Sequence, residues 1–113
     1  MKVVGQTISM VRGDSESIVV SCNNADGTQV PFSDGDTVYF TIKVNTETDA
    51  KILQKVTTSF SDGKAVIEIN PADTKSLQYN TYVYDVQWTK ANGTVTTIIP
   101  PSGFAIESEV TYE

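Results

Sequence analysis

The chain has 113 residues, of which 39% are hydrophobic and 19% charged, a composition that excludes a disordered or fibrous protein and fits one globular domain, residues 1–113. It carries 14 acidic and 8 basic residues, giving a net charge of −6, so nucleic acid and anionic membranes are not expected as partners, because both select a basic surface. No apolar run is long enough for a transmembrane helix, and the first residues turn polar too early for a signal peptide, so secretion by that route is not expected.

In the first part of the chain, apolar and polar residues alternate, which is the pattern of half-buried β-strands. Strands are expected at residues 7–11, 16–22 and 36–44, separated by glycine-containing turns. The residues expected to face the core are Ile8, Met10, Ile18, Val20, Cys22, Val38, Phe40, Ile42 and Val44, while Tyr39, Thr41 and Lys43 point the other way. Cys22 is the only cysteine, so it forms no internal disulfide and is interpreted as a small buried hydrophobe.

The segment 51–60 has an ambiguous pattern. Ile52, Val56 and Phe60 recur every four residues, which fits one face of a strand but also a helix. The β-branched residues that begin at Val56 favour the strand.

A short helical turn is expected near residues 71–77, because Asn70 suits the N-cap and Pro71 the first helical position. Leu77 would then pack into the core. This turn separates two further strands, at residues 64–69 and 81–89. Their core-facing residues are expected to be Ala65, Ile67, Ile69, Tyr82, Tyr84, Val86 and Trp88.

The end of the chain predicts a hairpin followed by a last strand. Asn92-Gly93 is typical of a type I′ turn, since both positions need positive φ, and residues 94–99 would return along the hairpin. Pro100-Pro101 would then interrupt the ladder. Phe104, Ile106 and Val110 are expected in the last strand.

These elements predict an all-β fold, an immunoglobulin-like β-sandwich of seven or eight antiparallel strands with one short helical turn near residues 71–77. The turn before Tyr82 is also compatible with a tyrosine corner, in which the phenol hydrogen-bonds the backbone upstream of its own strand.

The residue types exclude most catalytic arrangements. Histidine is absent, the single cysteine excludes thiolate zinc sites, and no glycine-rich phosphate loop occurs, so we expect no enzyme, no cofactor and no metal. A pair of carboxylates of the glycosidase type remains conceivable, although acidic residues scattered over turns are usually a solvated surface.

Three short motifs have simpler explanations than function. Asp34 and Asp36 could touch a calcium ion, but Asp-Gly pairs are typical of tight turns. Arg12-Gly13-Asp14 resembles an adhesive tripeptide, and a glycine turn between two strands is the simpler interpretation. Asn92-Gly93-Thr94 matches a glycosylation acceptor, yet it is also the expected hairpin turn.

The candidate functional surface consists of three apolar residues that alternation directs away from the core. Tyr39, Val83 and Ile98 would lie on neighbouring strands and form a possible assembly surface, with ordinary scattered surface hydrophobes as the alternative.

Strand-and-turn motifs along most of the chain resemble the immunoglobulin-like N-terminal domain of phage baseplate upper proteins and related short prophage proteins. The motifs that carry the resemblance are Arg12-Gly13-Asp14, the segments 34–43 and 62–69, Pro71-Ala72-Asp73-Thr74 with Leu77, and the segment 82–86. The resemblance implies a non-enzymatic structural protein of a phage or prophage tail or baseplate. Its partners would be other virion or tail proteins, with a homo-oligomer as an option, and it would lie in the virion or in the host bacterial cytoplasm.

The chain departs from that family in length, since the long helical and C-terminal attachment regions are missing, which leaves a small accessory subunit or a relative of unassigned role. The alternative function is a carbohydrate or cell-surface binding module. In that alternative Tyr39, Tyr79 or Trp88 would stack on sugars, although Trp88 is in phase with the core residues.

Overall fold

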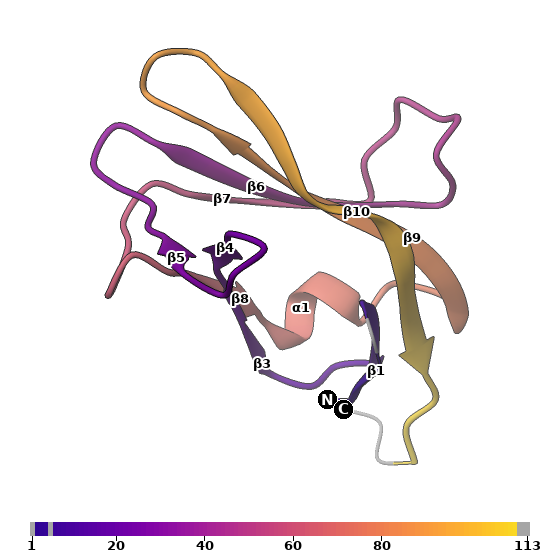
Figure 1. The fold of residues 1–113 in the computed structure, drawn as a ribbon. Coiled ribbons are helices and arrows are strands. Elements are labelled where there is room, and N and C mark those ends of the chain that lie inside the picture. Colours follow the sequence, from indigo (N-terminus) through magenta and orange to yellow (C-terminus); the bar gives the residue numbers. More distant parts are fainter. Residues whose placement is uncertain (1, 5, 111–113) are drawn as a thin grey trace.

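The structure is a computed structural model that describes residues 2–4 and 6–110, and it confirms the all-β class, because it consists mainly of strands with one short helix (Figure 1). In chain order the elements are β1 (Lys2–Val4), β2 (Thr7–Val11), β3 (Glu16–Val20), β4 (Cys22–Asn23), β5 (Gln29–Val30), β6 (Thr37–Lys43), β7 (Leu53–Thr57), β8 (Ala65–Ile69), α1 (Pro71–Thr74), β9 (Asn80–Thr89) and β10 (Val95–Glu107). The helix α1 has four residues, so no helix of the described chain is long and apolar enough to cross a membrane.

One large sheet contains six strands in the order β1-β2-β10-β9-β6-β7, and two smaller sheets pair β3 with β8 and β4 with β5. All pairs are antiparallel except one: Phe104–Glu107 of β10 runs parallel to Ile8–Val11 of β2. The expectation of antiparallel strands throughout is therefore wrong at this pair. The two strands are far apart in sequence, so no hairpin turn sets their relative direction.

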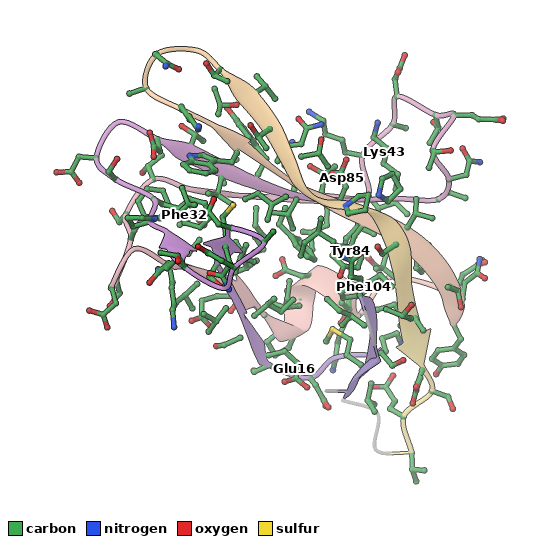
Figure 2. All side chains as sticks on the ribbon, in the orientation of Figure 1. Glu16, Phe32, Lys43, Tyr84, Asp85 and Phe104 are labelled. Carbon is green, nitrogen blue, oxygen red and sulfur yellow. The ribbon has the colours of Figure 1, made fainter. Side chains whose placement is uncertain are left out.

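The alternation of the sequence produces the core. Along β6, β8 and β9 every second residue is buried, as the sequence predicts. A single hydrophobic cluster joins residues of the large sheet to residues of β3 and β8. Three of its rings, those of Phe40, Tyr84 and Phe104, lie with centroids 5.3 to 6.0 Å apart, and Figure 2 shows Tyr84 and Phe104 on the side of the large sheet that faces α1.

The predicted type I′ turn does not occur at Asn92-Gly93, and a turn of this type occurs elsewhere. The hairpin at Asn92-Gly93 exists, but of these two residues only Gly93 has a positive φ (90°), so the turn is not type I′. Instead Gly93 N–H donates to the carbonyl of Lys90, and a glycine in the left-handed region closes a three-residue loop. The type I′ turn lies at Asp62-Gly63, where both φ values are positive (54° and 71°).

Four apolar residues near strand ends or bulges do not follow the predicted pattern. Val44, expected in the core, and Val110, expected in the last strand, are 54% and 104% exposed because the strands β6 and β10 end before them. Val56 is 53% exposed: the segment is a strand, as expected, but Val56 lies opposite Tyr39 on the outer face. Phe32, which the sequence analysis does not assign to the core, is 3% exposed.

Two predicted strands also break or continue at other places than expected. The strand expected at residues 16–22 breaks at Ser21 and resumes as β4, which pairs with the unpredicted two-residue strand β5. The two strands expected on either side of Pro100-Pro101 form one strand, β10, with irregularities in its register on β9 between Thr97 and Ser102. The prolines thus bend the ladder without ending the strand.

The helical turn lies where the sequence predicts it. Asn70 is the N-cap, Pro71 is the first helical residue, and the Asp73 carboxylate accepts a hydrogen bond from Asn70 N–H at 2.8 Å. Just after it, the Tyr82 hydroxyl donates to the carbonyl of Gln78 at 2.8 Å, the phenol-to-backbone bond expected before this strand. Together these bonds fix how the chain enters β9.

Candidate functional site

Two of the three predicted surface residues lie on the outer face of the large sheet. Tyr39 pairs with Gln87 and Val83 pairs with Lys43 across β6 and β9, so both point away from the core. Ile98 does not share this face: it is half-buried and packs against the core, because a shift in the register of β10 follows Thr97. The predicted patch is therefore not continuous, and the expectation for Ile98 is wrong.

Tyr39 and Val83 line one hollow of about 390 Å³ that opens to solvent. Its floor consists of outward-facing side chains of β6 and β9. One wall is the loop between β6 and β7, which rises above the sheet on the side away from α1 (Figure 1), and Pro101 of β10 contributes to the lining as well. The lining residues that matter below are Tyr39, Thr41, Lys43, Lys51, Gln54, Val83, Asp85, Gln87 and Pro101.

Asp85 is the carboxylate of this hollow. It lies opposite Thr41, one step along the outer face from Lys43, and Figure 2 shows Asp85 and Lys43 together on the outer side of the sheet, away from Tyr84. Partial burial raises the pKa of Asp85, and the positive charge of Lys43 opposes that rise. Among the described residues its carboxylate makes no hydrogen bond and no ion pair, which leaves its oxygens available to a ligand.

A chain of hydrogen bonds stiffens the wall next to Asp85. Gln54 of β7 donates from Nε2 to Thr41 Oγ1 at 3.1 Å and accepts from Lys51 Nζ at 3.4 Å. These contacts connect the loop, β7 and β6, so the polar groups on this side of the hollow are held in place before any ligand arrives.

The other two aromatic candidates are less available. Tyr79 is 49% exposed, but the Arg12 guanidinium lies over its ring, 4.2 Å from the centroid, and donates to its hydroxyl at 2.8 Å. Trp88 is 4% exposed and packs edge-on against Phe32, as its phase with the core predicts.

The residues of two short motifs, Arg12-Gly13-Asp14 and Asp34-Gly35-Asp36, make contacts within the fold. Arg12 also donates to Glu109 and to the carbonyl of Leu77, and the glycine between Arg12 and Asp14 makes the expected turn, with a φ of 86°. The Asp36 carboxylate accepts hydrogen bonds from the backbone N–H groups of Ser33 and Ala91, and these lower its pKa. No group of three or more acidic, cysteine or histidine side chains in the described part of the chain is arranged to hold a metal ion.

A second feature is the open edge of the large sheet at the first half of β10. Val95–Ile99 pairs with β9 on one side, and β2 begins to pair with β10 only at Phe104, so no described strand covers the other side of Val95–Ile99. Val95 is 58% exposed, and the whole segment 91–106 contains no charged residue, in a chain with 22 charged residues from its 14 acids and 8 bases.

Sequence reasoning finds the outward direction of Tyr39, Thr41 and Lys43 but misses Asp85 and the loop wall. Alternation along β9 also directs Asp85 outward, so it was open to prediction once β6 and β9 were paired. Searches against protein-family models, curated proteins and solved structures find no match to this chain.

Proposed function

We propose that the chain is a non-enzymatic structural protein that acts through protein–protein contacts, and that these contacts use the open edge of β10. The resemblance of its motifs to the immunoglobulin-like domain of phage baseplate upper proteins supports assigning this role to a phage or prophage tail or baseplate. Catalysis is not part of the proposal, because the sequence has no histidine and one cysteine.

Two features support an immunoglobulin-like sandwich as the finer fold. The parallel contact of the first long strand, β2, with the last, β10, brings the two ends of the chain together in one sheet, and β3 with β8 supplies strands for a second layer over the same core. The bond from Tyr82 to the carbonyl of Gln78 has the geometry of a tyrosine corner.

The observation that carries the proposed assembly is the uncharged edge at Val95–Ile99. An exposed strand presents backbone N–H and C=O groups that another strand is able to pair with, and natural proteins usually protect such edges with charged side chains. Here the edge is rich in β-branched residues and has no charge, and Pro100 limits pairing to the five residues before it.

A second copy of the chain is the partner that the charges favour. Two copies of a protein with a net charge of −6 repel each other, and the repulsion is weakest where they meet through a neutral segment. Antiparallel pairing around Thr97 would produce a twofold dimer, in which the same edge serves both subunits. Because only Val95–Ile99 pairs, the interface is small, and we expect a dissociation constant in the micromolar range or weaker.

The test is to place a charge on this edge and measure the mass in solution by light scattering at several protein concentrations. Wild-type chain should pass from monomer to dimer as its concentration rises, and Thr97→Lys should remain monomeric, since Thr97 is exposed and the two introduced charges would face each other. Val19→Lys is the matched control, because Val19 is 60% exposed on β3 in the smaller sheet.

A wild-type chain that is monomeric at every concentration would overturn the homo-dimer. Dimerisation that Val19→Lys abolishes and Thr97→Lys leaves intact would move the interface to the outer face of β3 and β8, where Val19 lies directly opposite the exposed Val66.

A further inference from the structure

The floor of the hollow on the outer face of β6 and β9 presents side chains to a ligand. The floor belongs to strands whose backbone groups are engaged in the ladder between β6 and β9. A peptide strand therefore finds no free backbone to pair with between these two strands. A ligand that lies on this floor meets the side-chain groups that project from the sheet and from the loop.

Those groups are suited to hydroxyls. Asp85 presents a half-buried carboxylate with no hydrogen bond or ion pair within the described chain, and the Gln87 amide follows it on the same face of β9. Thr41, the cross-strand neighbour of Asp85, is already connected to Gln54 by a hydrogen bond. A carboxylate that is partly desolvated without a donor is costly, and a hydroxyl that donates to it recovers that cost.

Apolar surfaces lie beside the polar ones. The half-buried ring of Tyr39, with Val83 and Pro101, contributes apolar area to the lining of the same hollow. A pyranose ring has one face of C–H groups and a rim of hydroxyls, so it matches a site in which an aromatic ring and a few fixed polar groups converge.

We propose that this hollow binds one or two units of a saccharide, with Tyr39 packing on the C–H face of a pyranose ring and Asp85 accepting hydrogen bonds from adjacent hydroxyls. Lys43 and Lys51 line the same hollow, so the site also binds sugars that carry a carboxylate. The site is separate from the open edge of β10, so it gives the proposed assembly protein a second binding function.

The experiment combines a glycan array of bacterial surface saccharides with NMR titrations of isotope-labelled chain by chitobiose, maltose and digalacturonate. Binding should shift the backbone amides of residues 39–43 and 83–87 and leave those of β3 and β8 in place. Tighter binding of digalacturonate than of the neutral sugars would show that Lys43 and Lys51 contact the carboxylate of the ligand. Equal binding of all three sugars would contradict that role of the two lysines.

Variants separate a binding role from a structural one. Asp85→Ala and Tyr39→Ala should each weaken binding at least tenfold, while Thr89→Ala, on the same face of β9 but outside the hollow, should bind as the wild type does. Asp85→Asn should lose binding and keep or raise the melting temperature, because it removes a half-buried charge that makes no hydrogen bond or ion pair within the described residues. No array signal together with no amide shift, or binding that survives both alanine variants, would overturn the proposal.

Discussion

The substitution Tyr82→Phe tests the contact that fixes the entry of the chain into β9. Tyr82 is 6% exposed, and its hydroxyl donates to the carbonyl of Gln78 at 2.8 Å. Phenylalanine keeps the ring and its packing and removes only this bond. The expected loss is about 0.5 to 1.5 kcal/mol in the free energy of unfolding, the net value of one hydrogen bond. In a domain of this size each kcal/mol corresponds to roughly 4 °C in the melting temperature.

Urea unfolding measures this loss directly, with the fluorescence of Trp88 as the probe, since Trp88 is the single tryptophan and is buried. Tyr79→Phe is the matched control: its hydroxyl also takes part in a hydrogen bond, but the residue is exposed, so we expect a smaller loss. If Tyr82→Phe unfolds at the same urea concentration as the wild type, or costs no more than Tyr79→Phe, the bond does not anchor β9 and the support for a tyrosine corner is lost.

Two further substitutions test polar groups that hold loops in place. Thr74 is fully buried and its hydroxyl accepts from Gly13 N–H at 2.8 Å, so Thr74→Val should cost about 1 to 3 kcal/mol while Thr74→Ser retains the bond, as urea midpoints will show; equal costs would contradict this role. The pKa of Asp36 is lowered in the folded chain by the N–H groups of Ser33 and Ala91, so its contribution to stability is present above the unfolded pKa of about 3.9 and is lost as the pH falls through the lower folded value. Thermal unfolding between pH 6 and roughly pH 2.5 should therefore show a shallower acid loss for Asp36→Asn than for the wild type, and parallel curves would refute the assignment.

The parts of the fold that depend on local pattern were predictable. Every second residue of β6, β8 and β9 is buried, and α1 begins at Pro71 directly after its N-cap, Asn70. Both features were predictable because alternation and capping depend on residues only a few positions apart. Where a strand ends or its register shifts, the alternating pattern predicts the wrong direction for a side chain. Val44 lies one residue beyond β6, and Ile98 lies within the register shift between Thr97 and Ile99 of β10, so their directions depend on neighbours that the local sequence does not specify.

The candidate site depended on non-local information. Alternation directs Tyr39 and Asp85 outward, but only the pairing of β6 with β9 brings them to one face, and only the course of the loop before β7 turns that face into a hollow. The open edge likewise follows from strand order. Because β2 joins β10 no earlier than Phe104, the five uncharged residues of Val95–Ile99 have no second partner strand in the described chain, and no property of that segment alone indicates this.

Amide hydrogen exchange of the wild-type chain, compared at low and high protein concentration, tests most directly the claim that the chain assembles through the edge of β10. The account predicts that amides in Val95–Ile99 exchange more slowly at the higher concentration, while those of β3 and β8 keep their rates. The result that would contradict it is equal exchange rates in Val95–Ile99 at both concentrations, in a sample in which light scattering shows that the higher concentration contains the dimer.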